Sequence, residues 1–332
     1  AEYLEKDKDF SVALIDTKPY FEFTPGILRT IVEPEHARKI QVLHKDYLKR
    51  TEIIVGEVKE VGKNFVRVNG KKVKFDYLVI ASGSRYELPI KEQNVILATR
   101  LSRLKGYYEK LCGAKKVLLI GGGIVGVELS AEIATHYKDK EITLVHSGER
   151  LMPRNDIKTS SYAENFLRKK GVKIIFNDRV EKVSGKKCTT KNGLKIEADL
   201  IFICTGIKPN YEFMKKNFSK KIDSEGNLRV NKYLQLEGQN NIFVAGDVAG
   251  IKEEKTAQNA EFHAGIVMCN IRCLNKKKRM KEYKSMKRIM VISLGKWDGI
   301  LEYRSFVLTG LFPGILKTLI EKREMWRRTR WF

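Results

Sequence analysis

The stretch that decides the fold is Lys116–Glu128, which reads KVLLIGGGIVGVE. An apolar strand leads directly into G-x-G-x-x-G, and a helical pattern follows to about Tyr137. In such a loop Gly121 permits the tight turn, Gly123 lets the backbone approach a pyrophosphate, and Gly126 lets helix and strand pack closely. The strand before the loop and the helix after it favour a dinucleotide-binding βαβ unit over a glycine-rich turn that binds nothing.

The chain contains two copies of one structural unit. Residues 51–83 read as a strand, a hairpin and a second strand that ends in Ala81-Ser82-Gly83. Residues 172–206 repeat that order and end in Gly206, and each hairpin turns at an Asn-Gly pair. Two α/β units of the same design are therefore expected.

The repeat extends upstream of both segments. Residues 11–17 match residues 141–147 at a shift of 130 positions (141 − 11 = 130). At that shift, the counterpart of the strand and glycine loop at 116–130 would precede residue 1. We therefore expect the chain to begin inside the first helix of its first unit, and the first sheet to lack its central strand.

Composition and charge narrow the class of protein. A chain of 332 residues, of which 42% are apolar, is typical of two or three globular domains. The net charge of +24 is spread along the chain and attracts nucleic acid, anionic lipid or a nucleotide alike. No apolar run approaches the roughly 18 residues of a membrane-spanning helix. The five scattered cysteines indicate neither a disulfide framework nor a metal site.

Three positions suggest which dinucleotide each unit binds. About twenty residues after its glycine loop, a unit of this kind places an acid against the ribose hydroxyls of NAD. Here that position holds His146, with Arg150 nearby, so NADPH remains open. The equivalent position in the first unit is Asp16, as expected for the unphosphorylated ribose of FAD. Farther along, Asp247 follows a buried strand, where it either contacts a cofactor or caps the next helix.

These motifs together resemble the two-dinucleotide-binding-domain flavoproteins, in which one unit binds FAD and the other NAD(P)H. Within them the sequence looks most like the ferroptosis suppressor protein branch, also called AIF-like mitochondrion-associated inducer of death, and more distantly like type II NADH dehydrogenases. The resemblance covers nearly the whole chain. It is carried by the glycine loop, the strand end at His146, Cys204-Thr205-Gly206, Ala245-Gly246-Asp247 and residues 293–299.

The resemblance assigns cofactor contacts to residues in both units. In the FAD unit these residues are Asp16, Lys18, Ala81, Ser82, Gly83 and Asp247. In the NAD(P)H unit they are Gly121, Gly123, Gly126, Glu128, His146 and Gly206. Glu128 would also lie near the nicotinamide and flavin, and it is one of two candidate catalytic residues. The other is His263, which would relay a proton to a quinone, although a histidine satisfied within the protein is the simpler interpretation.

The activity that the resemblance implies is that of an FAD-dependent NAD(P)H:quinone oxidoreductase. One alternative is a non-enzymatic, NAD(P)H-dependent factor that binds nucleic acid. The other is a sulfide:quinone-type oxidoreductase, which needs cysteines beside the flavin, where neither Cys112 nor Cys204 is expected. Disulfide reductases of the same fold carry a cysteine pair soon after the position of Asp16, and no cysteine precedes Cys112 here.

The expected architecture is an α/β fold with two Rossmann-like dinucleotide-binding domains and a small C-terminal α+β region. We expect residues 1–113 and 231–285 to form the FAD-binding domain, residues 114–230 the NAD(P)H-binding domain, and residues 286–332 the C-terminal region. From Phe306 onward, apolar residues recur at helical spacing and are followed by basic residues and tryptophans. This pattern predicts that residues 306–332 lie on a membrane surface, and a core or homodimer helix is the alternative. We expect the protein to be peripheral, on the cytoplasmic side of that membrane.

Overall fold

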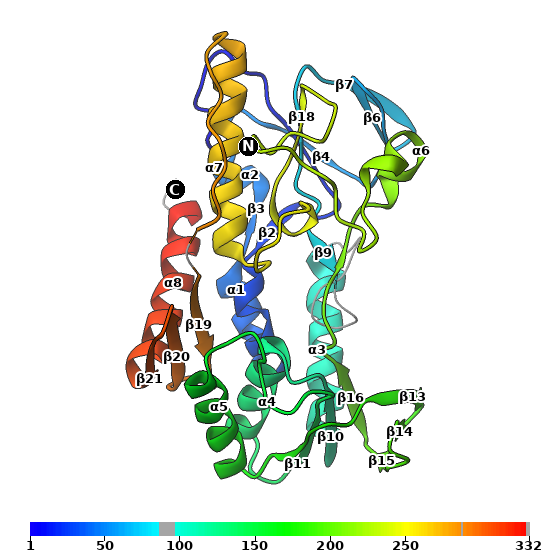
Figure 1. Ribbon diagram of the computed structural model, residues 1–332, viewed down its shortest axis with the longest axis vertical. Coiled ribbons are helices and arrows are strands. Elements are labelled where there is room, and N and C mark those ends of the chain that lie inside the picture. The colour runs from blue at the N-terminus through cyan, green and yellow to red at the C-terminus, as the bar shows by residue number, and fades with distance from the viewer. Residues whose placement is uncertain (86–96, 287, 330–332) are drawn as a thin grey trace.

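The computed structural model describes residues 1–85, 97–286 and 288–329 (Figure 1). Its best-formed sheet has four parallel strands, β10 (Lys116–Ile120), β11 (Glu141–Val145), β12 (Lys173–Ile175) and β16 (Leu200–Ile203). Their order is β12-β11-β10-β16, which is the strand order of half of a dinucleotide-binding fold. Helix α4 (Ile124–His136) connects β10 to β11, and α5 (Ile157–Lys169) precedes β12.

Burial on both faces explains why β10 reads as one apolar run. Val117, Leu118 and Leu119 are all buried, because helices cover the face of Val117 and Leu119 and the antiparallel strands around Cys188 cover the face of Leu118. Gly126 makes this packing possible, since a Cβ at that position would lie 1.9 Å from the carbonyl oxygen of Gly121. The glycine loop is therefore the point where α4 and the sheet approach most closely along their backbones.

Each unit contains a small antiparallel sheet of three strands, as the repeat predicts. In the first unit it consists of β5 (Val58–Val61), β6 (Phe65–Val68) and β7 (Lys71–Lys74). In the second it consists of β13 (Val180–Ser184), β14 (Lys187–Thr190) and β15 (Lys195–Glu197). The first hairpin turns at Asn69-Gly70, both in the left-handed region, which is typical of a two-residue turn between twisted strands.

The sheet of the first unit consists of two separate parallel pairs. One pair is β1 (Ala13–Asp16) with β4 (Glu52–Val55), and the other is β8 (Leu78–Ile80) with β18 (Ile242–Val244). In the second unit the corresponding strands are joined by β10, whereas no strand within the described residues joins the two pairs. This is the arrangement that the comparison of the two repeats predicts.

The C-terminal region packs against the flank of the molecule. It contains the antiparallel strands β19 (Ile289–Ser293), β20 (Gly299–Tyr303) and β21 (Phe306–Gly310), followed by α8 (Leu311–Thr329). Figure 1 shows this sheet and α8 on the same side as α7 (Ala257–Asn275), with the four-stranded sheet at the lower end. Thr256 caps α7 by accepting a hydrogen bond from the Asn259 amide at 3.2 Å.

Short elements complete the described chain. The remaining strands are β2 (Tyr20–Glu22), β3 (Gln41–Leu43), β9 (Ser84–Arg85) and β17 (Lys208–Pro209). The remaining helices are η1 (Thr24–Ile31), η2 (Pro34–His36), α1 (Ala37–Ile40), α2 (His44–Tyr47), α3 (Leu97–Gly113), η3 (Glu212–Met214), α6 (Lys215–Phe218), η4 (Ser219–Lys221) and η5 (Gly246–Val248). Among the residues described, no helix is both long and apolar enough to cross a membrane.

Two expectations about the ends of the chain are wrong. Helical structure does not begin at Phe306, because residues 306–310 pair with β20 as a strand and α8 begins only at Leu311. Pro313 then lies in the first turn of α8, where a missing amide costs nothing. Residues 1–9 run as successive turns rather than as a helix, since so short a segment is marginal as an isolated helix.

Substituting Gly126 should test how closely α4 and the sheet must approach. We expect Gly126→Ala to lower the free energy of unfolding by about 3 kcal/mol or more, because its Cβ would meet a backbone carbonyl that cannot move aside. The matched control is Gly106→Ala in α3, where a Cβ meets nothing within 4 Å, and it should stabilise by up to about 1 kcal/mol. Urea unfolding measures both, and equal effects would contradict the close approach.

Candidate functional site

The glycine loop forms an open cradle at the start of α4. Gly121 has φ +111°, and a Cβ there would lie 2.7 Å from the backbone oxygen of Cys204. Gly123 is the N-cap of α4 and gives it no side-chain cap, and a Cβ on Gly123 would meet nothing within 4 Å. Uncapped first-turn amides beside open space suit a pyrophosphate, so the residues present fit a dinucleotide.

His146 lies directly over this cradle. Its Nδ1 accepts a hydrogen bond from the Gly122 amide at 3.2 Å, so the ring proton is on Nε2. Nε2 is buried and has no hydrogen-bond partner within the described part of the chain. Burial lowers the pKa of His146, which keeps the ring neutral where an acid would otherwise stand. The result is one buried donor beside Gly148 that has no partner in the described part of the chain.

Arg150 is bound to its own loop rather than directed at a 2′-phosphate by any contact within the described residues. Its guanidinium donates to the carbonyls of Pro153 and Asn155 and to the hydroxyl of Ser160. These bonds fasten the loop that leads into α5. Gly206 lies after β16 with φ +109° and open space around its Cβ position, as a cofactor contact requires.

The predicted flavin contacts come together at the ends of β8 and β18. Asp247 follows β18, and its Oδ2 accepts a hydrogen bond from the Ser84 hydroxyl at 2.5 Å. Ser82 donates to the backbone oxygen of Asn210 at 2.7 Å, and the Asn210 side chain donates back to the carbonyl of Ser82. Ala81 directly follows β8, and Gly83 takes a left-handed conformation with φ +64°. The two strand ends therefore form one polar cluster.

Asp16 and Lys18 lie at the end of β1, as predicted. The Asp16 carboxylate accepts from the backbone amide of Lys18 at 2.9 Å and is 3.4 Å from Nε2 of His44. Burial alone would raise the pKa of Asp16, but hydrogen bonds from His44 and Lys18 hold it below its usual value. An ionised acceptor at this strand end is what a ribose hydroxyl needs.

Glu128 is the centre of a buried ionic cluster. Its Oε1 accepts from Nζ of Lys317 at 2.5 Å and from the Ser293 amide at 2.8 Å. One turn along α4, Glu132 pairs with Arg29 at 3.1 Å, and burial raises the pKa of Glu132 despite that partner. The cluster joins α4 to η1, β19 and α8. The sequence predicts a role for Glu128 but does not identify its partners. The signal that it does offer is a pair of acids four residues apart on an otherwise apolar helix, because buried acids need partners.

His263 is fully engaged inside the protein. Its side chain is buried on α7, Nδ1 accepts from the Gly246 amide at 3.1 Å, and Nε2 lies 2.6 Å from Glu253. Both ring nitrogens therefore have partners. This arrangement is that of a satisfied histidine and does not favour a proton relay to a quinone.

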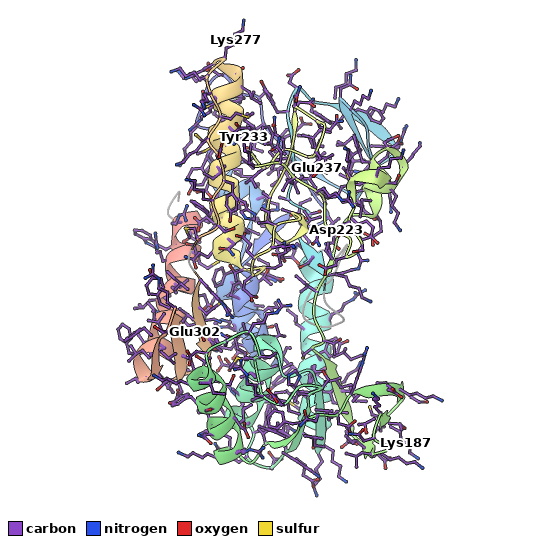
Figure 2. All side chains as sticks on the ribbon, in the orientation of Figure 1. Lys187, Asp223, Tyr233, Glu237, Lys277 and Glu302 are labelled. Atoms are coloured by element: carbon purple, nitrogen blue, oxygen red, sulfur yellow. The ribbon has the colours of Figure 1, made fainter. Side chains whose placement is uncertain are left out.

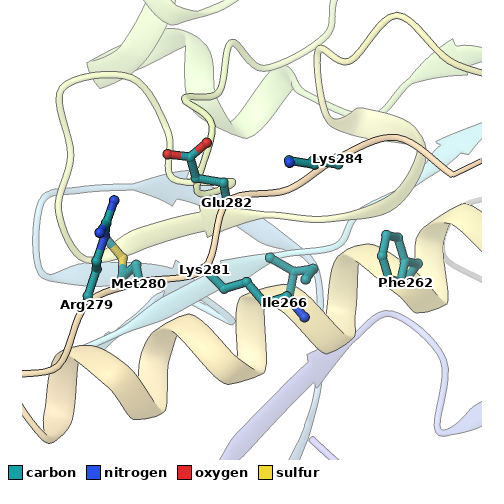
Figure 3. A pocket seen from close by; sticks show the side chains of 7 residues that line it. All are labelled: Phe262, Ile266, Arg279, Met280, Lys281, Glu282 and Lys284. Carbon is teal, nitrogen blue, oxygen red and sulfur yellow. The ribbon is translucent and has the colours of Figure 1, made fainter.

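A cavity of about 540 Å³ lies elsewhere on α7 (Figure 3). Figure 3 shows Phe262 and Ile266 rising from α7 toward the segment that carries Arg279, Lys281 and Lys284. Met280 and Glu282 complete its lining. None of the residues predicted from the sequence for a cofactor contact lines this cavity.

A glycine cradle on one parallel sheet, and a second cluster of strand ends built around Asp247, define a two-unit α/β protein of nucleotide-dependent type. The chain belongs to the pyridine nucleotide-disulphide oxidoreductase family, whose sequence profile matches residues 1–264. This membership confirms the resemblance found in the sequence and the prediction of a pyridine nucleotide as cofactor.

Curated relatives cover most of the chain. The apoptosis-inducing factor homolog B of Dictyostelium discoideum is 34% identical, over 92% of this chain and 87% of that protein. The ferroptosis suppressor protein 1 of Homo sapiens is 28% identical, over 96% of this chain and 88% of that protein.

Solved structures show the same fold at low sequence identity. The sulfide:quinone oxidoreductase of Aquifex aeolicus superposes with a TM-score of 0.85 at 18% identity, over 99% of this chain and 88% of that one. NDH2 of Plasmodium falciparum in complex with NADH superposes with a TM-score of 0.82 at 16% identity, over 98% and 92% of the two chains. The expected α/β fold class is confirmed at this level.

A double-mutant cycle should measure the coupling between Glu128 and Lys317. We expect Glu128→Gln and Lys317→Met each to lower the free energy of unfolding, and the double variant to lose about 1–3 kcal/mol less than their sum, because either single change leaves one partner uncompensated. Urea unfolding of the four proteins gives the coupling. Additivity to within about 0.5 kcal/mol would show that the pair contributes nothing specific.

Proposed function

We propose that the chain is an FAD-dependent NAD(P)H:quinone oxidoreductase that works at a membrane surface. The observation that carries the proposal is the Glu128–Lys317 pair, because it joins the helix of the glycine cradle to the helix that exposes apolar residues. The proposal includes an FAD-binding domain from residues 1–113 and 231–285, an NAD(P)H-binding domain from residues 114–230 and a C-terminal region from residue 286. Quinone is the acceptor class because a relative of the same fold is a sulfide:quinone oxidoreductase.

Helix α8 supports the membrane part of the proposal, because its polarity is reversed. Toward the protein it presents charged side chains beside the buried Met325: Lys317 pairs with Glu128, Glu321 with His36 at 3.1 Å, and Arg328 lies 4.0 Å from the ring centroid of Phe21. Its outward stripe is apolar and consists of Leu311, Phe312, Ile315, Leu319 and Trp326, all exposed. A helix on a globular core normally has the opposite arrangement.

Neighbouring residues extend the apolar stripe of α8. Trp297, in the turn between β19 and β20, is 62% exposed, and Phe306 is 57% exposed. Exposed Lys322 and Arg323 lie beside the stripe on α8. Apolar side chains with tryptophans and basic neighbours are typical of a surface that rests in the lipid headgroup region. Attachment is therefore proposed to be peripheral, and its assignment to the cytoplasmic side rests on the resemblance alone.

The chain's own residues bind and orient the cofactors in this mechanism. FAD, when bound, accepts a hydride from reduced nicotinamide and passes two electrons to the acceptor. Gly123 and the first-turn amides of α4 would hold the NAD(P)H pyrophosphate, and His146 would position the loop by accepting from the Gly122 amide. Glu128, held by Lys317 and the Ser293 amide, would fix the nicotinamide end of the site. Asp16 and Asp247 would accept from hydroxyl groups of FAD.

The cysteines argue against the sulfide:quinone alternative. Cys204 is buried beneath the glycine loop, and burial raises the pKa of its thiol to about 12. Cys188 is also buried, and burial raises the pKa of its thiol too. Cys112 is exposed on α3, while Cys269 and Cys273 lie on α7. Sulfide oxidation needs reactive thiolates, and protonated buried thiols do not supply them.

The distribution of charge favours an oxidoreductase over a nucleic-acid-binding factor. Figure 2 shows Lys277 and Lys187 at opposite ends of the molecule. A protein that binds nucleic acid typically gathers its positive charge on one face or along one groove. Positive charge at both extremities instead follows the even distribution seen along the sequence.

An absorbance spectrum tests the proposed function directly. The purified chain, supplied with FAD, should show a flavin band that bleaches when NADH is added without oxygen and returns when a short-chain quinone is added. Bleaching without recovery would refute quinone as the acceptor. A flavin band that is bleached by neither NADH nor NADPH would refute the proposed electron donor.

Charges placed on the outer stripe of α8 should weaken binding to lipid vesicles. We expect the double variant Phe312→Glu and Leu319→Glu to reduce partitioning onto anionic vesicles at least about tenfold, because each apolar side chain contributes roughly 1.5–3 kcal/mol when buried. The matched control is Ile157→Glu, which changes a 60% exposed isoleucine on α5. Co-sedimentation measures both, and an equal loss in the control would show that net charge, not the stripe, governs binding.

A further inference from the structure

We propose that His263, Glu253 and Tyr283 form a positioning relay that fixes the Gly246 amide, and through it the loop that carries Asp247. The consequence for FAD rests on the proposed function, in which Asp247 contacts that cofactor. The anchoring of the loop does not depend on it.

The three side chains form one continuous chain of hydrogen bonds. Gly246 donates its amide to Nδ1 of His263 at 3.1 Å, and Nε2 of His263 is 2.6 Å from Oε1 of Glu253. The other oxygen of Glu253 accepts from the Tyr283 hydroxyl at 2.6 Å. The Tyr283 ring also packs edge-on against the imidazole, with centroids 4.8 Å apart and an interplanar angle of 87°. Every donor in the chain has an acceptor.

The direction of these bonds fixes one tautomer of His263. A backbone amide can only donate, so Nδ1 must carry no proton and Nε2 must donate to Glu253. Burial is the largest influence on the ring and lowers the pKa of His263, although Glu253 and Asp247 oppose this and Lys255 adds to it. Burial and Glu253 raise the pKa of Tyr283, so the phenol keeps the proton that it donates.

Protonation of His263 would break the relay at its inner end. An imidazolium would direct an N–H group at the N–H group of Gly246, and the two donors would repel. Gly246 has φ +74° and begins η5, so its amide is one residue away from the Asp247 carboxylate. Asp247 in turn holds the Ser84 hydroxyl at the end of β8. Movement of the Gly246 amide would therefore reach the whole polar cluster.

The segment that carries Tyr283 is held in place by hydrogen bonds that do not belong to the relay. Fully buried Asn270 on α7 donates to the carbonyls of Tyr233 and Lys281 and accepts from the Lys281 amide at 2.7 Å. The Tyr283 amide donates to the carbonyl of Lys232 at 2.8 Å. These bonds hold the segment that follows α7 against the helix, which places Tyr283 over Glu253.

The decisive measurement is hydrogen exchange of the Gly246 amide in the full chain without added cofactor. We expect His263→Leu to speed this exchange roughly tenfold, since it removes the acceptor, and His263→Gln to restore most of the protection, because an amide can both accept and donate. Tyr283→Phe should have a smaller effect of roughly threefold, through Glu253. The matched control, Tyr162→Phe, removes a hydroxyl that donates to Asp298, and should leave Gly246 unchanged.

Two further readouts separate positioning from simple packing. Nitrogen NMR of the wild-type imidazole should show the proton on Nε2, and a proton on Nδ1 would overturn the proposal. Unchanged Gly246 exchange in His263→Leu would overturn it as well. The affinity for FAD should fall about tenfold in His263→Leu and recover in His263→Gln. If the wild type binds no FAD, the proposed function fails while the exchange experiment still decides the relay.

The pH dependence has a definite sign. The pKa of His263 is lowered from 6.5 in the folded protein, so the unfolded or opened state binds a proton that the closed state does not. Protection of Gly246 should therefore be complete above pH 6.5 and be lost as the pH falls below it. In His263→Gln this protection should no longer fall at low pH. An identical loss of protection at low pH in wild type and variant would contradict the relay.

Discussion

A buried carboxylate must be paired, and Glu128 finds its partners only outside its own unit. It stands on α4 just after the glycine loop, yet it accepts hydrogen bonds from Lys317 of α8 and from the Ser293 amide of β19. One turn farther, Glu132 binds Arg29 of η1. These bonds fix the C-terminal region and the first unit against the helix of the glycine cradle. The geometry of the site therefore depends on side chains that meet across three parts of the chain.

The sequence predicts those parts of the fold whose determinants are local. Apolar runs, glycines at fixed offsets and Asn-Gly turns specify the four-stranded sheet and both antiparallel three-stranded sheets. Residues 306–310 were misassigned because a short apolar run fits a helix as well as a strand. Only the partner strand β20 decides between them. Lys317 and Arg29 were missed because they lie 189 and 103 positions from the acids they bind.

The two units each hold a glycine-containing loop at a strand end, although the two loops are not counterparts in the repeat. In the second unit, β10 pairs with β16, and the backbone of Cys204 packs directly against Gly121. In the first unit, the loop at Gly246 is held by the imidazole of His263 from α7. The glycine loop has an imidazole acceptor too, because the Gly122 amide donates to Nδ1 of His146, and such an acceptor works only while the ring is neutral. Both loops therefore depend on a histidine ring that stays neutral.

The reversed polarity of α8 also determines how the molecule can approach another phase. Its inner stripe is fastened by Lys317 and Glu321, so the helix cannot roll to hide Phe312 or Leu319 without breaking buried ion pairs. Any lipid layer that accepts the outer stripe therefore meets the protein in a single pose. The protein and an acceptor dissolved in that layer would then meet by diffusion in two dimensions. The acceptor would always meet the same edge of the protein.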